Sequence, residues 1–241
     1  MAGHNKWSKV KNVKGKEDAK RAKEFTKLSR MLMVVSREGG SDPLYNSALN
    51  MAIEKAKAAN MPNDNIERAI KKGAGEIEGQ EFEEITYEGY GPQGVAILVE
   101  CLTDNKNRTA SNVRHAFDKF GGNLGTSGSV SYLFDYKGIF VLEDQDFDEE
   151  EVFMNVLEAG GEDVKKQDGI YLITAASQDF AEVLKNLEEV GYQFQVKQLG
   201  YLAKTKIDVS DEEAKENLES MIEMLEEDDD VQEVYTTWAD F

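Results

Sequence analysis

Lysines near the N-terminus recur at a spacing that could hold a polyanion. Five of them follow one another at intervals of two or three residues between Lys6 and Lys16, and an aromatic ring, Trp7, lies among them. Ammonium groups attract phosphates whatever the base sequence, and an indole can stack on an unpaired base. We therefore predict a basic arm that binds nucleic acid, made of Lys6, Trp7, Lys9, Lys11, Lys14 and Lys16. A solubilising tail is the alternative, which an exposed tryptophan disfavours.

Further cations lie along a helix that the sequence predicts from Lys16 onward. On a helical wheel one face is apolar, and we expect it to be buried: Ala22, Phe25, Ser29, Leu32 and Met33. The opposite face carries cations, which we expect to be exposed and to bind phosphates: Lys16, Lys20, Lys23, Lys27 and Arg30.

A row of hydrogen-bond donors is expected on a later helix, in the segment 103–120 (TDNKNRTASNVRHAFDKF). The members of this row share one polar face of the wheel: Arg108, Asn112, His115 and Lys119. Such a row can grip phosphate or sugar oxygens, so Arg108 and Lys119 join the predicted nucleic-acid site. A solvated helix face is the alternative interpretation.

Residues suited to catalysis or metal binding are sparse. Only two histidines occur, His4 and His115, and no C-x-x-C or H-x-x-x-H pair is present for zinc. The glycine-rich stretch 121–128 (GGNLGTSG) follows a helix and lacks G-K-[ST], so we interpret it as a helix C-cap and a mobile loop rather than a phosphate cradle. The acidic run 226–230 is interpreted as a solvated turn, with metal binding as the alternative. We predict no catalytic residue, no bound metal, no cofactor and no small-molecule substrate.

Charge is divided unevenly along the chain. Residues 1–75 contain 16 Lys+Arg and 8 Asp+Glu, whereas residues 76–241 contain 12 and 39, and the net charge is −19. A basic segment attached to an acidic body can still bind phosphates, while the body itself is repelled by them. No apolar run is long enough to span a membrane, and the N-terminus lacks the apolar core of a secretory signal. We therefore expect a cytoplasmic chain without membrane contact.

Three helices are predicted before residue 76. The first ends at Gly39 and Gly40, and Asp42 followed by Pro43 is typical of the N-cap and first turn of the second. The third is short and ends near Gly73. Together these helices predict a small helical domain.

Beyond a glycine-rich linker the apolar pattern changes from the helical to the strand period. Strands are predicted at 84–90, 94–103 and 128–136, with a helix at 105–120. A strand, helix, strand, strand, helix and strand follow in the order of a ferredoxin-like unit: 138–143, 147–159, 162–166, 170–175, 178–190 and 192–198. After a strand at 199–209 and a helix capped by Ser210, a last strand at 233–238 must pair backwards with the sheet of 84–136.

The predicted fold class is therefore α+β with three domains. We expect a basic arm and small helical domain at 1–76, a discontinuous α+β domain at 80–136 plus 199–241, and an inserted ferredoxin-like β-α-β-β-α-β domain at 137–198.

Several long segments closely resemble the YebC/PmpR family. They are MAGHNKWSKVK, KGKEDAKRAKEFTKLSR, DPLYNSALNMAIEKAKAANMPNDNIERAIKK, TDNKNR, GGNLGTSGSVSYLF and the final YTTW. The resemblance implies a three-domain protein and a bacterial cytoplasmic member, because the chain has no N-terminal targeting extension. Family members are described as transcriptional regulators that bind DNA. A mitochondrial relative is a translational activator of cytochrome oxidase subunit I, and some bacterial members are linked to the ribosome and to relief of stalling at proline-rich stretches. The family supplies no agreed catalytic residues.

Two nucleic-acid targets follow from this resemblance, and the residue types favour one of them. The cationic face of the first helix is almost all lysine, which attracts phosphates but does not read bases as Arg, Asn or Gln would. We therefore predict a non-enzymatic nucleic-acid-binding regulator of gene expression that acts in translation through ribosome or RNA association. A DNA-binding transcriptional regulator is the first alternative. A protein-interaction scaffold, with a protein partner on the acidic α+β domains, is the second.

Overall fold

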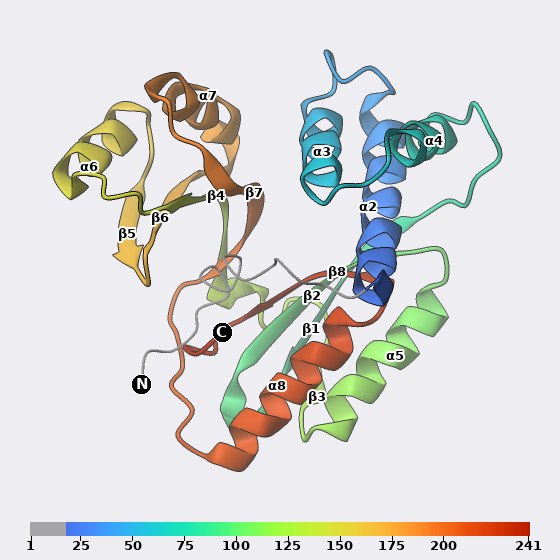
Figure 1. The fold of residues 1–241 in the computed structure, drawn as a ribbon. Helices are drawn as coiled ribbons and strands as arrows, with labels where there is room; N and C mark the ends of the chain where they lie inside the picture. Colours follow the sequence, from blue (N-terminus) through green and yellow to red (C-terminus); the bar gives the residue numbers. More distant parts are fainter. Residues whose placement is uncertain (1–17) are drawn as a thin grey trace. The chain divides into compact units, whose positions relative to one another are not determined.

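The computed structural model describes residues 18–241, with side chains from residue 21 onward, and the described residues form two compact units (Figure 1). The major unit comprises residues 18–131 together with Val209–Thr236, and the inserted unit comprises Tyr132–Asp208 together with Thr237–Phe241. The predicted basic arm, Lys6 to Lys16, lies outside the described residues, and so does the side chain of Lys20. The domain boundaries expected from the sequence stay a prediction.

Three helices begin the major unit: α2 (Asp18–Gly39), α3 (Ser47–Ala58) and α4 (Asn63–Gly73). One apolar cluster joins them, and its fully buried members come from all three helices and the α3–α4 connection: Leu28, Leu32, Leu49, Ala52, Ala56, Met61, Ile66 and Ala69. The helical wheel of α2 therefore predicted burial of Leu32 correctly, whereas Ala22 is exposed. Burying these aliphatic side chains supplies the main driving force for this three-helix packing.

The second helix begins later than the sequence predicted. Asp42 and Pro43 lie in a turn, in which the Asp42 carboxylate accepts a hydrogen bond from the backbone N–H of Leu44 (2.9 Å). The N-cap is Asn46, whose side chain accepts from the backbone N–H of Leu49 (3.0 Å) and donates to the carbonyl of Val35 (2.8 Å). Asn46 can bond to both helices at once, so it caps α3 in place of Asp42.

A four-stranded antiparallel sheet in the order β3-β1-β2-β8 follows in the same unit. Its strands are β1 (Glu83–Tyr90), β2 (Ala96–Thr103), β3 (Asn123–Leu124) and β8 (Val231–Thr236), with a 3₁₀ turn at Pro92–Gly94. Two helices, α5 (Lys106–Lys119) and α8 (Glu212–Glu226), run side by side across this sheet (Figure 1). The last strand pairs backwards into this sheet, as the sequence predicted, and its partner is β2.

The inserted unit has the predicted β-α-β-β-α-β order. Its elements are β4 (Phe134–Glu143), α6 (Glu149–Glu158), β5 (Asp163–Gln167), β6 (Ile170–Ala176), α7 (Phe180–Val190) and β7 (Phe194–Ala203), with 3₁₀ turns at Ser131–Leu133 and Ser177–Asp179. All pairs are antiparallel in the order β5-β6-β4-β7, which is the ferredoxin-like arrangement. The predicted fold class, α+β, is confirmed.

Two strands of this unit are longer than predicted. The sequence placed a break before Gly138 and another at residue 199, but β4 and β7 each run through these points and pair Gly138 with Leu199. Gly138 serves packing rather than a turn, since a Cβ atom there would lie 2.7 Å from the ring of Phe180. The glycine therefore brings α7 close to the sheet without interrupting it.

The glycine-rich loop of the major unit is held by a buried carboxylate that the sequence did not reveal. Both carboxylate oxygens of Glu88 accept backbone N–H bonds at 2.8 Å, from Gly128, Val130 and Ser131. Burial alone would raise the pKa of Glu88, but these three donors outweigh it and lower the pKa. The loop begins as predicted at a helix C-cap, with Gly121 at φ +73°.

We predict that Glu88→Gln destabilises the major unit by about 1–3 kcal/mol, because an amide nitrogen would face backbone donors that now meet a carboxylate oxygen. Chemical denaturation monitored by circular dichroism measures the loss. The matched control is Glu84→Gln, an exposed carboxylate on the same strand, which we expect to change stability by less than about 0.5 kcal/mol. Equal effects of the two substitutions would show that the loop does not depend on Glu88.

Candidate nucleic-acid interface

The C-terminal end of α8 and the turn after it accept cationic side chains from α2. Lys27 Nζ donates to the carbonyl oxygen of Glu226 (2.6 Å), Lys23 Nζ to that of Glu227 (3.2 Å), and the Arg30 guanidinium to that of Asp229 (2.6 Å). The last carbonyls of a helix have no partners within it, and they form the negative end of its dipole. Cations from α2 therefore stabilise a helix end that carries its own carboxylates.

Asp230 lies at the centre of this contact and is buried, with a side chain only 2% exposed. Its carboxylate forms ion pairs with Arg30 and Arg108, the latter at 2.8 Å, and accepts from the hydroxyl of Thr109 (2.7 Å). Burial would raise the pKa of Asp230, but hydrogen bonds from Arg108, Thr109 and Arg30 lower it. A buried carboxylate with this many donors is stable in its charged form.

Local structure explains how Arg108 reaches Asp230. The helix α5 is capped by Asn105, whose side chain accepts from the backbone N–H of Arg108 (3.1 Å), so the position of Arg108 in the first turn is fixed. The backbone carbonyl of Asp230 accepts from the N–H of Leu102 at the end of β2 (2.8 Å). Pairing of β8 with β2 therefore places the carboxylate beside the start of α5.

The acidic run 226–230 is thus only partly the solvated turn that the sequence predicted. Glu226, Glu227 and Asp229 have exposed side chains, but Asp230 is buried, and Asp228 accepts a hydrogen bond from the Asn112 amide (2.8 Å). The prediction was wrong for Asp230 because its partners come from α2 and α5, far away in the sequence.

The structure separates the predicted phosphate-binding residues into groups. Four of them gather around the acidic run: Lys23, Lys27, Arg30 and Arg108. Lys119 lies apart near the end of α5, exposed, with its ammonium 5.1 Å from the ring centroid of Phe120. The part of the cationic face of α2 that contains Lys27 and Arg30 is therefore packed within the major unit, and both residues are partly buried.

Burial changes the chemistry of Lys27 in particular. Desolvation lowers the pKa of its ammonium, and the opposing carboxylates, of which Glu226 is the strongest, only partly offset that effect. Two turns further along α2, Val34 packs with Phe82 and Leu102 in a small apolar cluster. This face of α2 meets the sheet rather than solvent.

A different set of cationic side chains in the helical part is exposed and makes no ion pair or hydrogen bond with another described residue; they belong to Arg21, Lys57, Arg68 and Lys71. Two of them lie on α4, an amphipathic helix that buries Ile66 and Ala69 against the core. The sequence analysis missed these residues. A helical wheel of 63–73 would have placed Arg68 and Lys71 opposite the apolar face.

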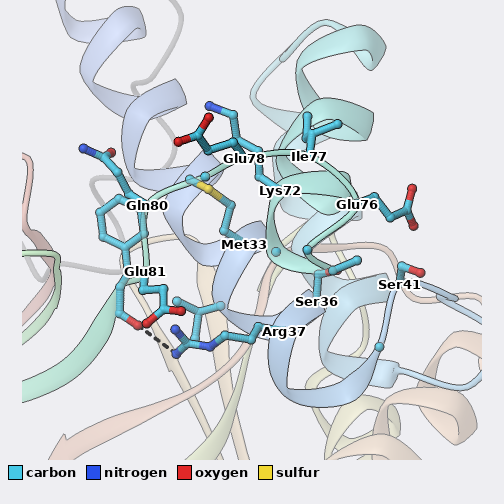
Figure 2. A pocket seen from close by; sticks show the side chains of 17 residues that line it. Met33, Ser36, Arg37, Ser41, Lys72, Glu76, Ile77, Glu78, Gln80 and Glu81 are labelled. Atoms are coloured by element: carbon cyan, nitrogen blue, oxygen red, sulfur yellow. Dashed lines mark hydrogen bonds between the residues drawn. The ribbon is translucent and has the colours of Figure 1, made fainter.

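A groove of about 740 Å³ lies where the segment 74–82 passes the ends of α2 and α4 (Figure 2). Arg37 donates to the backbone carbonyl of Phe82 (2.8 Å), and the cationic side chains of Arg37 and Lys72 share the groove with three carboxylates: Glu76, Glu78 and Glu81. Such mixed charge gives no excess attraction for phosphate.

The described residues offer neither a cluster of metal ligands nor an exposed thiol. None of their His, Cys, Asp and Glu side chains form a group of three or more that could hold a metal ion. Cys101 is a buried residue of β2, and burial raises the pKa of its thiol well above the usual range, which disfavours the reactive thiolate. Across residues 18–241 we find no helix with the length and apolarity to cross a bilayer.

We predict that Asp230→Asn destabilises the major unit by about 3 kcal/mol, because it leaves Arg30 and Arg108 without their shared carboxylate. Urea denaturation measures the change. The control is Asp229→Asn, since Asp229 is exposed and its backbone carbonyl still accepts from Arg30. A loss as small as that of the control would contradict the role given to Asp230.

The stability difference between the wild-type protein and Asp230→Asn should depend on pH. Because the pKa of Asp230 is lowered on folding, its contribution is complete above its unfolded value near 4 and is lost as the pH falls toward the lower folded value. The stability difference between wild type and Asp230→Asn should therefore shrink below about pH 4.

Comparisons with known proteins agree with this architecture. The model of the TACO1/YebC N-terminal domain matches residues 5–76, and that of the TACO1/YebC second and third domain matches residues 82–238. A "Probable transcriptional regulatory protein" of Finegoldia magna is 54% identical over 99% of both chains, and the protein YrbC of Bacillus subtilis, with the same description, is 50% identical over 99% of both. The crystal structure of a conserved hypothetical protein from Aquifex aeolicus has a TM-score of 0.85 and 46% identity, over 94% of each chain.

These descriptions support a role in regulating gene expression. The two family models together cover most of the chain, the relatives are half identical over their full length, and the resemblance seen in the sequence is confirmed. The chain therefore belongs to the TACO1/YebC family.

Proposed function

We propose that this protein is a non-enzymatic regulator of gene expression that binds nucleic acid through its basic N-terminal part and acts in translation through ribosomal or other structured RNA. The observation that carries the proposal is the excess of cations over carboxylates in the N-terminal part, of which only some contact acceptors within the protein. Residues 1–75 contain 16 Lys+Arg against 8 Asp+Glu. Among the cations whose side chains the structure describes, from residue 21 onward, Lys23, Lys27 and Arg30 contact the acidic run 226–230. The relatives' descriptions support the regulatory role.

The predicted contacts divide into two roles under this proposal. Lysines of the basic arm, together with Lys20, Arg21, Lys57, Arg68, Lys71 and Lys119, contact phosphates directly. Lys23, Lys27, Arg30 and Arg108 hold α2 and α5 against the acidic run. The Arg30 side chain is only 13% exposed, so a phosphate would have to displace Asp230 to reach it. Their contribution to binding is to position the helices that carry the exposed cations.

Structured RNA fits this arrangement because the basic arm is rich in lysine and contains one aromatic ring. Lysine attracts the backbone as a point charge, and RNA is recognised largely by shape, backbone and unpaired bases. Crosslinking in cells, followed by sequencing of the bound RNA and DNA, tests the target. Recovery of ribosomal RNA supports the proposal, whereas recovery of promoter DNA alone would favour transcriptional control.

We predict that replacing Lys9, Lys11, Lys14 and Lys16 by Glu weakens RNA binding uniformly across sequences. Each lost phosphate contact should also flatten the salt dependence of the affinity, by about 0.7 log unit on single strands and about 0.9 on duplex DNA. Filter binding at several salt concentrations measures both effects.

The control carries the same number of charge reversals on lysines of the acidic region: Lys165, Lys185, Lys204 and Lys215. All four pair with a neighbouring carboxylate, so they should contribute little to phosphate binding. If both quadruple variants bound equally well at moderate salt, the binding surface would lie outside the basic arm.

A DNA-binding transcriptional regulator is the second candidate, and one feature of the helical part favours it. The residues 59–62 join α3 to α4 as a short turn, and α4 presents Arg68 to solvent, as the second helix of a helix-turn-helix presents base-reading side chains. Arginine can bond to guanine with two hydrogen bonds, which lysine cannot reproduce in the same geometry.

The substitutions Arg68→Lys and Arg68→Ala separate the two candidates. For backbone contact we expect Arg68→Lys to bind RNA within about twofold of wild type, and Arg68→Ala to bind several-fold more weakly on every sequence. Competition binding against RNA and DNA of varied sequence measures the effects. A loss of about tenfold or more for Arg68→Lys, confined to one DNA sequence, would instead indicate base reading.

A further inference from the structure

One helix of the inserted unit presents an apolar face to solvent. Phe153, Met154 and Leu157 of α6 are 46%, 53% and 49% exposed, while Val152 and Val156 on the other side of the helix are buried. The three exposed residues are neighbours on the helix, because Leu157 lies three and four positions after the other two. Single exposed apolar residues are ordinary, but a contiguous group of large ones marks an interaction site.

The local structure holds this face in a defined orientation. Asp148 caps the helix by accepting from the backbone N–H groups of Glu150 (2.9 Å) and Glu151 (3.1 Å). One turn further, the Asn155 amide donates to the hydroxyl of Tyr192 (2.8 Å), which ties the helix to the residues after α7. A partner would therefore meet a preformed surface and would lose little affinity to ordering it.

Carboxylates border the apolar residues. Glu149 and Glu150 precede Phe153 and Met154 by one turn, and Glu158 follows Met154 by one turn. A shallow, open depression of about 690 Å³ lies beside the first turns of the helix, lined by Asp148, Glu149, Glu150, Phe153 and Met154. We define these residues, with Leu157 and Glu158, as the α6 surface.

The charge of the α6 surface restricts the partner. Residues 132–208 contain 17 Asp+Glu and only 7 Lys+Arg, so phosphate backbones and anionic membranes are repelled. A second copy of the chain that docked through the same surface would place like charges opposite each other around the apolar residues. Lysine or arginine side chains, in contrast, would pair with the bordering carboxylates while apolar side chains cover Phe153, Met154 and Leu157.

We propose that the α6 surface binds a cationic amphipathic segment of another protein. The apolar side chains of that segment contact Phe153, Met154 and Leu157, and its lysines or arginines lie beside Glu149, Glu150 and Glu158. This inference goes beyond the proposed nucleic-acid role and uses none of its residues. Each can therefore fail without the other.

Site-specific photocrosslinking in the full-length chain tests the proposal. A p-benzoylphenylalanine at Phe153, introduced in cells of the native host, should crosslink to a Lys/Arg-rich segment that mass spectrometry identifies by sequence. The control position is Val190, which is 50% exposed at the end of α7. We expect at least a fivefold higher yield of this segment from position 153 than from position 190.

Two surface variants show which chemistry is responsible. Met154→Gln with Leu157→Gln should lower the yield at position 153 at least fivefold. When a lysate of these cells is irradiated at low salt, Glu149→Gln with Glu150→Gln should lower the yield about threefold, and much less at roughly 0.5 M salt, where exposed charges are screened. Glu182→Gln with Glu189→Gln, exposed carboxylates of α7, should have no effect. Thermal unfolding verifies that each variant is folded.

Several outcomes would overturn the proposal. These are crosslinks only to nucleic acid, crosslinks only to a second copy of the chain, equal yields at positions 153 and 190, and no crosslink at all. Loss of RNA binding by the basic-arm variant bears on the nucleic-acid role alone and leaves the result at position 153 unchanged.

Discussion

A buried carboxylate, Asp230, meets side chains from three elements of the major unit. Arg30 comes from α2, Arg108 and Thr109 from α5, and Thr103 from the end of β2. A charge that is 98% shielded from water is tolerated only when donors replace its hydration, so its position constrains where these elements can lie. The helices α2 and α5 are therefore attached to the start of β8 by electrostatics as well as by apolar packing.

This constraint determines how the cations of the helical part are used. Lys23, Lys27 and Arg30 face carbonyls and carboxylates at the end of α8, and burial in that contact lowers the pKa of Lys27. A cation that is bonded to a carbonyl or carboxylate of the protein is poorly available to a phosphate, because it would first have to break that bond. Exposed cations such as Arg68 and Lys71 have no such cost. Charge counting along a sequence cannot separate these two kinds of cation, whereas the structure does.

The sequence predicted the parts of this fold that depend on local pattern. The apolar period located most helices and strands. The need of a final strand for a partner predicted that it pairs backwards with the sheet of 84–136, and in the structure β8 pairs with β2 of that sheet. Where two local signals competed, the sequence was less informative. Asp42 and Asn46 can both cap a helix, and only the contact of Asn46 with the carbonyl of Val35 decides between them. The sequence pattern predicts a new strand that starts at Gly138, because the close contact of this glycine with Phe180 is not visible in the sequence.

The buried carboxylates could not be predicted for a related reason. Asp230 is 200 residues from Arg30 and 122 from Arg108, and Glu88 is 40 residues from Gly128. In the sequence, Asp230 belongs to a run of five acidic residues, four of which differ from it in being at least partly exposed. An acidic run at a helix end is ordinarily solvated, so a pattern-based interpretation treats its members alike. Asp230 can be told apart from the other four acidic residues only when one knows which cations the fold brings next to it.

Unequal charge along the chain has a physical consequence for any polyanion that binds it. Attraction is confined to the basic part, since the 39 Asp+Glu of residues 76–241 repel a phosphate backbone wherever they approach it. The number of phosphate contacts is thereby limited, and with it both the affinity for arbitrary nucleic acid and the steepness of its salt dependence. Specificity for a target then has to come from something other than backbone charge. A second contact that tolerates acidic side chains, such as one with a cationic protein segment, would supply it without raising the affinity for nucleic acid in general.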